Sequence, residues 1–209
     1  GKGGKTTKSI KEELGSKLNI SPIVNLMCDQ GLLIRGAPQK GWKSNLHTYH
    51  LFNEYFSNIR LDRVGEADAR RMVVEVYIST FGPVTETDIA WWTGFPQSQI
   101  SQIINDLKDK VAHVETSAAG DDYLVSSQQI DSLMSMRPIR RNVANLLPRL
   151  DPYVISYKER DRYLDSENHH YVFDPAGNAT STILLNGETI GIWDVCEKAS
   201  PLIKLFLFE

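Results

Sequence analysis

The sequence has few cysteines, no long apolar run and no excess of positive charge. Its two cysteines, Cys28 and Cys196, are far apart and belong to no CxxC or Cys/His ligand spacing. This excludes a disulfide framework, and we interpret both as buried small hydrophobic residues in a reducing cytoplasm. No apolar run approaches the roughly 20 residues of a membrane span, and no signal peptide precedes the first predicted helix. We therefore expect a cytoplasmic protein with no membrane partner, no bound metal and no cofactor.

The charge balance argues mildly against a nucleic-acid partner, because 23 basic and 26 acidic side chains give a net charge of −3. The distribution of these charges weakens that objection. Residues 1–45 carry eight cations and three acids, a local balance of +5. A second basic run, free of acids between Ser132 and Leu150, contains Arg137, Arg140, Arg141 and Arg149. Each cation alone is typical of a solvated surface, but either cluster is also suited to facing phosphates.

Two stretches, roughly 78 residues apart, are similar to one another. They are GKTTKSIKEELG at 4–15 and FGPVTETDIAWWTG at 81–94, and each is typical of the second helix of a helix-turn-helix. An apolar stripe at i, i+3 and i+4 follows both on the same offset. Its members are Ile23, Leu26 and Met27 in the first copy and Ile100, Ile103 and Ile104 in the second. The repeat predicts tandem winged helices.

The first predicted winged helix covers residues 1–60. Thr7 is expected to cap a helix over 8–14, and Ser21-Pro22 to start a second that runs to about Gln30. Strands over 32–35 and 46–51 would form a wing around a polar loop. Such a fold needs another helix ahead of Thr7, and residues 1–5 are only glycine and lysine, so we expect the chain to start inside a domain.

The second predicted winged helix covers residues 61–136. Its first helix, over 66–80, would end at Gly82-Pro83, and Thr85 and Asp88 would form a capping box for the next. A third helix is expected from Pro96 to about residue 108, with wing strands over 111–115 and 123–125. The residues predicted to point inward are Ala69, Val73, Val76, Tyr77, Ile89 and Trp92.

The third helix of this unit would expose a polar face beside its buried isoleucines. Short amide and hydroxyl side chains are suited to base edges and phosphates in a major groove, and they are equally ordinary on a wet helix. This predicted DNA-reading face consists of Gln97, Ser98, Ser101, Gln102 and Asn105.

Residues 137–209 are predicted to form a small β-rich domain. Asn186-Gly187, between two apolar runs, is a strong hairpin signal. With further strands expected over 153–157 and 202–208, the domain would be open or barrel-like. The predicted fold class is therefore α+β, with tandem winged helix-turn-helix domains followed by a β-rich, barrel-like domain.

Several motifs resemble the tandem winged-helix proteins that include bacterial alkylpurine and interstrand-crosslink DNA glycosylases. They are GWKSN at 41–45, the 81–94 stretch, LLPRLDPY at 146–153, VFDPAG at 172–177 and ILLNGETIGIW at 183–193. The resemblance implies three winged helices that, with a barrel-like domain, cradle duplex DNA. It also implies a catalytic Gln-hydrophobic-Gln or Gln-hydrophobic-Asp motif near the N-terminus.

No residue of this chain is assigned that catalytic role. By similarity the chain begins within the second winged helix, so the motif would precede Gly1. Gln129-Ile130-Asp131 matches the pattern but follows the second wing, and we interpret it as a coincidence; Gln97-Ser98-Gln99 fails because its middle residue is polar. Among the acids, Asp88 is better explained as a helix cap, Asp151 as a turn residue and the run 160–162 as surface ion pairs.

Two residue pairs and one single tryptophan are further candidates for binding. Trp91 and Trp92 suit base stacking, but packing in the core is the commoner role. His169-His170 lacks a third ligand at metal-binding spacing. Trp42, flanked in the first wing by Lys40 and Lys43, suits a groove or a phosphate backbone as well as packing on its own domain.

These features leave three functions open. The first is the DNA-binding portion of a glycosylase-like repair protein acting on duplex DNA as a monomer. The second is a non-catalytic winged-helix regulator, which would usually dimerise on paired half-sites. The third is a protein-interaction scaffold.

Overall fold

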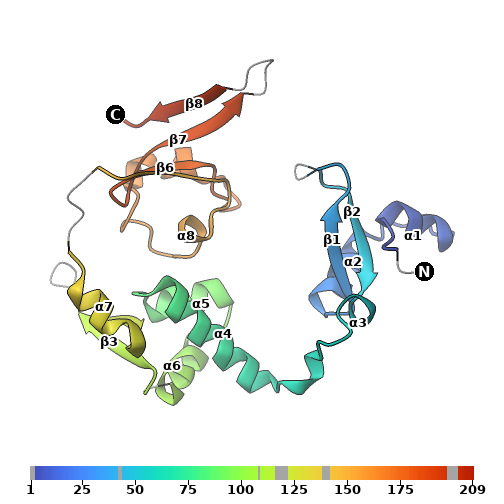
Figure 1. The fold of residues 1–209 in the computed structure, drawn as a ribbon, viewed down its shortest axis with the longest axis horizontal. Coiled ribbons are helices and arrows are strands. Elements are labelled where there is room, and N and C mark those ends of the chain that lie inside the picture. Colours follow the sequence, from blue (N-terminus) through green and yellow to red (C-terminus); the bar gives the residue numbers. More distant parts are fainter. Residues whose placement is uncertain (1–2, 42–43, 108, 116–121, 138–141, 197–201) are drawn as a thin grey trace. The chain divides into compact units, whose positions relative to one another are not determined.

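The computed structural model describes residues 3–41, 44–107, 109–115, 122–137, 142–196 and 202–209. The chain divides into two compact units, Gly1–Glu66 and Ala67–Glu209. This division lies near the predicted boundary at 60/61, while the predicted boundary at 136/137 stays a prediction. Among the described residues, no helix has the length and apolar character needed to cross a bilayer. Figure 1 shows the elements of each unit.

Unit 1 places two helices before an antiparallel strand pair. Thr6, and not the predicted Thr7, caps the first helix, because its hydroxyl accepts a hydrogen bond from the Ser9 backbone N–H at 3.1 Å. The second helix is confirmed to within one residue, and Gly31 follows it with a φ of +69°. The elements are α1 (Thr7–Glu13), α2 (Ser21–Asp29), β1 (Leu33–Pro38), β2 (His47–Leu51), α3 (Phe52–Tyr55) and the 3₁₀ turn η1 (Leu61–Arg63).

The buried core of unit 1 is small. Ile20 and Val24 are its buried apolar residues among those described. The stripe predicted from the repeat is wrong here, since Ile23 and Leu26 are 54% and 55% exposed. Helix α2 instead turns Val24 inward, which leaves Ile23 and Leu26 more than half exposed, while Met27, the third member of the predicted stripe, is half-buried.

Unit 2 begins with three helices and a second antiparallel strand pair. The predicted capping box is confirmed, because the Thr85 hydroxyl accepts from the Asp88 N–H at 3.0 Å and the Asp88 carboxylate accepts from the Thr85 N–H at 3.1 Å. Gly94, with a φ of +70°, ends that helix. The elements are α4 (Glu66–Phe81), α5 (Glu86–Thr93), α6 (Gln97–Asp106), β3 (Val111–Glu115) and β4 (Asp122–Ser126).

The core of these helices differs in part from the predicted one. Helix α4 buries Val74, Tyr77 and Ile78, whereas the predicted Val73 and Val76 are 40% and 60% exposed. The reason is that Val74, Tyr77, Ile78 and the half-buried Phe81 themselves follow the i, i+3, i+4, i+7 spacing of one helix face. In α6 the predicted stripe is confirmed, and its buried members are Ile100, Ile103, Ile104 and Leu107.

Trp92 is not fully inward as predicted, because 44% of it is exposed. Its ring nevertheless packs on Tyr77, with centroids 5.0 Å apart, and lies 6.5 Å from Phe81. The predicted inward position of Ile89 is confirmed, since that side chain is fully buried.

The remainder of unit 2 contains a four-stranded antiparallel sheet with the order β5-β6-β7-β8. The barrel-like prediction is wrong for the described residues, because the sheet is open and its end strands, β5 and β8, do not pair with one another. The elements are the 3₁₀ turn η2 (Ser127–Gln129), α7 (Ile130–Ser135), β5 (Ala144–Leu147), α8 (Pro152–Ile155), the 3₁₀ turn η3 (Ser166–Asn168), α9 (His169–Val172), β6 (Thr182–Leu185), β7 (Glu188–Cys196) and β8 (Leu202–Leu207).

Two local predictions in this region had opposite outcomes. The β6–β7 hairpin is confirmed, with Asn186 and Gly187 at φ values of 55° and 95°, as a type I′ turn requires. The strand predicted over 153–157 is wrong, because Asp151 accepts a hydrogen bond from the Tyr153 N–H at 2.9 Å and Pro152 starts the short helix α8.

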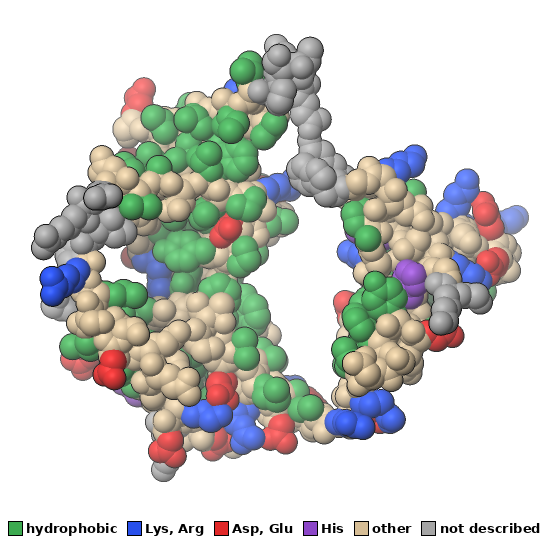
Figure 2. All heavy atoms as spheres, in the orientation of Figure 1, with side chains coloured by type: hydrophobic (Ala, Val, Ile, Leu, Met, Phe, Trp, Pro, Cys, Tyr) green, Lys and Arg blue, Asp and Glu red, His purple; other side chains and the backbone are tan. Residues whose placement is uncertain are grey.

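Strand β8 is an edge of this sheet, and all six of its residues are exposed. Figure 2 shows hydrophobic side chains gathered over β7 and β8. Cys196, at the end of β7, is half-buried, as is Cys28 in unit 1, so neither is as buried as predicted.

Candidate nucleic-acid interface

The predicted DNA-reading residues lie on one surface of α6. Gln97, Ser98, Gln102 and Asn105 are exposed, and Ser101 is half-buried. They share a face because helical residues four apart are stacked along the axis, and the buried isoleucines occupy the opposite face. The predicted surface therefore exists as a geometric feature, and its contact with DNA stays a prediction.

Glu86, in the first turn of α5, adds a carboxylate to this surface. Its Oε2 accepts a hydrogen bond from the Ser101 hydroxyl at 2.6 Å and another from the Gln97 side-chain amide at 3.1 Å. Two of the five predicted side chains are thus hydrogen-bonded to an acid that no sequence pattern had placed beside them. The carboxylate orients these side chains but adds a negative charge to a surface that was predicted to face DNA.

Arg70 lies beside the first turn of α6. Its Nη1 donates to the Gln99 side-chain oxygen at 2.5 Å, and its guanidinium lies 4.9 Å from the centre of the Phe95 ring. The apolar periodicity of α4 predicted only which residues of that helix are buried. Arg70 was therefore not predicted as a neighbour of α6. No signal in the sequence joins positions 70 and 99, because only the packing of α4 against α6 does so.

Asp88 fixes the position of α5, and through it the helix pair α5–α6. The buried carboxylate accepts from the Lys158 N–H at 2.9 Å and from Arg162 Nη2 at 3.1 Å, in addition to its capping bond. Arg162 also donates to the Pro83 carbonyl at 2.9 Å and lies 4.1 Å from the centre of the Tyr157 ring. The interpretation of residues 160–162 as surface ion pairs is therefore wrong for Arg162.

Buried tyrosines complete this support. The Tyr77 hydroxyl donates to the Ser156 carbonyl at 2.6 Å, and the Tyr157 hydroxyl donates to the Phe81 carbonyl at 2.8 Å. Burial raises the pKa of Tyr157 to about 12, and it also raises the pKa of Tyr77 and of Tyr163. All three are therefore neutral hydrogen-bond donors at ordinary pH.

The wing of unit 1 is described only in part. Lys40 is exposed in the loop between β1 and β2, while Trp42 and Lys43 lie outside the described residues. The two wing histidines already have neighbours: His47 Nδ1 lies 3.0 Å from the Gly36 carbonyl, and the His50 ring meets the edge of Tyr55 at 5.0 Å. A role for this wing in DNA binding stays a prediction.

The first of the two basic clusters has local acidic partners, and the second is described only in part. In the first, Lys5 pairs with Glu13 at 2.5 Å and Lys8 lies 4.0 Å from Glu12, so acids offset part of the positive charge (Figure 2). In the second, Arg137 is exposed after α7, and Arg140 and Arg141 lie outside the described residues.

The remaining candidates have structural neighbours. Gln129, in the string that matches the catalytic pattern, donates its amide to the Ser79 carbonyl at 2.9 Å. The guanidinium of Arg160 lies 5.7 Å from the half-exposed Trp91 ring and 3.1 Å from His169 Nε2. Across the described ranges, no cluster of three histidine, cysteine or acidic side chains is placed to hold a metal.

Comparison with known proteins gives a consistent result. A sequence profile described as DNA glycosylase AlkZ-like matches residues 2–203. Among solved structures, DNA glycosylase AlkZ of Streptomyces sahachiroi matches with a TM-score of 0.74 at 16% sequence identity, over 97% of this chain and 56% of that chain. No curated protein sequence matches significantly. Since the profile covers nearly all of the sequence, the chain belongs to the DNA glycosylase AlkZ-like family.

Proposed function

We propose that this chain is the DNA-binding portion of a winged-helix, DNA-glycosylase-like repair protein that acts on duplex DNA. The family match over residues 2–203 is the observation that carries the proposal. The order of elements supports the winged-helix assignment, because in unit 2 the helices α4, α5 and α6 precede the antiparallel pair β3/β4. In unit 1 the helices α1 and α2 likewise precede β1/β2.

In this proposal α6 is the element that enters the major groove. Its exposed amides, Gln97, Gln102 and Asn105, would meet base edges, which such side chains contact through paired donor and acceptor atoms. Phosphate contacts would come from three cations: Arg70 beside α6, Arg137 after α7 and Lys40 on the unit 1 wing. Because Glu86 faces the same groove, we expect α6 to contribute more to orientation than to affinity.

We propose no catalytic residue within this chain. Breaking an N-glycosidic bond requires a carboxylate or amide held accurately against the sugar and a positioned water molecule. Two of the candidate side chains have other partners: the Asp88 carboxylate accepts from Lys158 and Arg162, and the Gln129 amide donates to a backbone carbonyl. The chain spans 56% of the solved AlkZ chain, so any excision belongs to a proposal about the longer protein.

Binding to a duplex of random sequence, measured over a range of salt concentrations, tests this function. Affinity should fall steeply as salt rises, because each phosphate contact releases counterions. Lys40→Glu should weaken binding by about tenfold, since it replaces an attractive charge with a repulsive one. Arg71→Glu is the matched control, because Arg71 is exposed on α4 and already pairs with Asp68 at 2.7 Å.

The alternatives give different results in the same experiment. No binding at low salt would favour a protein-interaction scaffold and would rule out the proposed function. Binding by a dimer, detected by sedimentation, would favour a regulator that reads paired half-sites. Unchanged affinity in Lys40→Glu would remove the unit 1 wing from the interface.

A further inference from the structure

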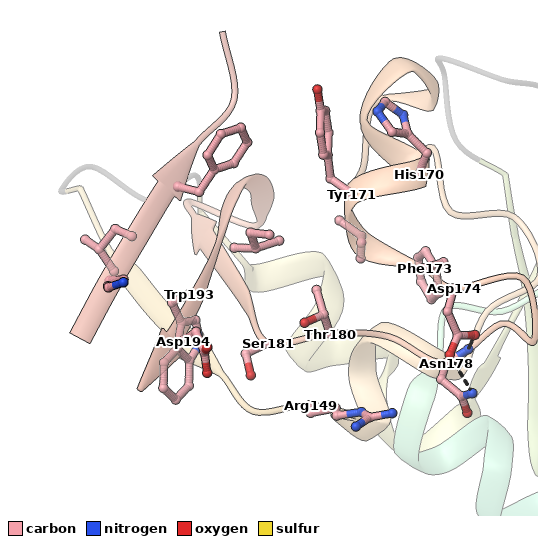
Figure 3. Close-up of a pocket in the computed structure, with 15 residues that line it drawn as sticks. Arg149, His170, Tyr171, Phe173, Asp174, Asn178, Thr180, Ser181, Trp193 and Asp194 are labelled. Atoms are coloured by element: carbon pink, nitrogen blue, oxygen red, sulfur yellow. Dashed lines mark hydrogen bonds between the residues drawn. The ribbon is translucent and has the colours of Figure 1, made fainter. Parts of the chain in front are cut away.

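A cavity of about 750 Å³ lies between β7, β8 and the segment around α9, within unit 2 and away from α6. Figure 3 shows Tyr171 and His170 on one side, Trp193 and Asp194 on the other, and Thr180 and Ser181 between them. Its volume is within the range of about 300 to 1,000 Å³ that is typical of small-ligand sites. Nothing in the proposed contacts of α6 uses it.

Aromatic rings line both sides of this cavity. Tyr171 and Phe206 are 44% and 50% exposed, and their ring centroids are 5.5 Å apart. Phe208 stacks on Tyr171 with an interplanar angle of 24°, which fixes the tyrosine ring from behind. Trp193 is also fixed, because its indole N–H donates to the Leu147 carbonyl at 2.8 Å. Exposed rings held in place in this way offer stacking surfaces at little entropic cost.

The floor of the cavity carries polar groups that are available to a ligand. The backbone N–H of Thr180 donates to the Val172 carbonyl at 2.8 Å, and the Ser181 carbonyl accepts from Trp193 at 3.1 Å, so both residues are anchored through their main chains. Their hydroxyls have no hydrogen-bond partner among the described residues. Donors and acceptors near an aromatic wall match the edge and the face of a planar heterocycle.

The charges limit what kind of anion the cavity accepts. Arg149 and Lys204 line it, and so do Asp174 and Asp194, which gives a formal balance of zero. Asp174 is occupied, because one oxygen accepts from the Ala176 and Asn178 N–H groups and the other from the Asn178 amide, each at 2.9 Å. Asp194 lies directly opposite Lys204 in the strand register. Such a site suits one phosphate beside Arg149. It does not suit a continuous nucleic-acid backbone, because several phosphates would need an excess of positive charge.

We propose that this cavity holds one unpaired nucleotide, with its base against Tyr171 and Phe206 and its phosphate beside Arg149. Base stacking on aromatic side chains is the usual mode for unpaired bases and tolerates any base identity. The inference rests on the proposed function, since it names a second contact for the bound DNA. If the cavity binds an unpaired nucleotide, the chain should bind distorted duplexes more tightly than fully paired ones.

The test compares two duplexes of equal length, one fully paired and one with a single bulged 2-aminopurine, whose fluorescence falls on stacking. We expect the intact chain to bind the bulged duplex about tenfold more tightly and to quench its fluorescence. Tyr171→Ala and Phe206→Leu should lose both effects while their affinity for the paired duplex stays unchanged. Tyr171→Phe, which keeps the ring, should retain both.

Three controls make the outcome decisive. Tyr55→Ala removes a half-exposed ring of unit 1, outside the cavity, and should have no effect on the preference. Arg149→Gln should reduce binding of the bulged duplex by about threefold to tenfold, whereas Arg71→Gln should not. Far-ultraviolet circular dichroism of every variant shows that the loss is not caused by unfolding.

A chain with no preference for the bulge, or a preference that persists in Tyr171→Ala and Phe206→Leu, would overturn the cavity assignment and leave the proposed function intact. Failure to bind the paired duplex would instead overturn the proposed function. In that case a single-stranded hexanucleotide decides the cavity assignment by itself: binding lost in Tyr171→Ala supports it, and no binding by the unaltered chain refutes it.

Discussion

The fully buried carboxylate of Asp88 accepts hydrogen bonds from the backbone N–H groups of Thr85 and Lys158 and from the side-chain guanidinium of Arg162. A buried charge is tolerable only when its partners remain in place. Asp88→Asn should therefore destabilise the chain by about 3 kcal/mol, because Arg162 would lose its charged partner and Thr85 part of its cap. Urea unfolding monitored by tryptophan fluorescence measures this.

Asp161→Asn is the matched control for that prediction. Asp161 lies next to Arg162 in the sequence but is exposed, so its replacement should change the free energy of unfolding by less than about 0.5 kcal/mol. Equal losses in the two variants would show that Asp88 acts only as one more acidic side chain.

The buried tyrosines predict a loss of stability in alkaline solution. Folding raises the pKa of Tyr157 to about 12 from an ordinary value of about 10, and the pKa values of Tyr77 and Tyr163 are raised as well. The unfolded chain then releases these protons first, so the stability present below about pH 10 declines as the pH rises toward 12. Urea midpoints measured from pH 8 to 12, with tyrosinate absorbance, check this.

Tyr157→Phe should be less stable than the unaltered chain at neutral pH, because it loses the hydrogen bond to Phe81, but its midpoint should fall less between pH 10 and 12. A folded chain whose tyrosines all ionise near pH 10 would contradict the assignment of burial as the cause.

For the polar face of α6, the sequence predicted which side chains are exposed but not which residues they contact. The polar face of α6 follows from helical periodicity alone, so Gln102 and Asn105 were placed correctly at the surface. The contacts of Glu86 with Gln97 and Ser101, and that of Arg70 with Gln99, depend on how three helices pack. Patterns within one segment of the sequence do not predict contacts between different helices.

Helix α5 depends on its capping box as an element. Thr85 accepts from the N–H of Asp88, and Asp88 accepts from that of Thr85, at the first turn of α5, where backbone N–H groups have no acceptor within the helix. Thr85→Ala should cost about 1 kcal/mol of folding free energy. Thr87→Ala, two residues into the helix, removes a similar hydroxyl without touching the cap and should cost less than half as much; thermal unfolding of the two variants compares them.

Elements with strong local signals were predicted well, and those set by tertiary packing were not. The Asn186-Gly187 turn and the buried stripe of α6 each rest on a short-range rule, and both are confirmed. The strand predicted over 153–157 failed because the Asp151 cap outweighed the β propensity of its tyrosine and valine residues. The barrel failed because closure depends on pairing between distant strands, which hydrophobic alternation does not encode.

At the scale of the whole molecule, the two units should differ in stability. Among the described residues, unit 1 buries Ile20 and Val24, whereas unit 2 has a continuous core built around residues such as Tyr77, Ile100 and Tyr163. We expect amide protons in α2 and β1 to exchange at least about tenfold faster than those of α6 and β3, because opening a small core exposes little apolar surface. Hydrogen exchange followed by mass spectrometry, corrected for intrinsic rates, tests this; equal protection in both units would contradict it.

Strand β8 has a consequence for how the protein behaves at high concentration. No strand in the described part of the chain pairs with its outer edge, and the exposed side chains of Ile203, Leu205 and Leu207 lie along one face. A hydrophobic edge strand is a template on which further strands add, so the purified chain should be prone to aggregation. Lys204 is the one charged residue within the strand, and it acts as a gatekeeper that slows such growth. Leu205→Lys would add a second charge to the exposed face of the strand and should therefore raise the concentration at which the chain remains soluble.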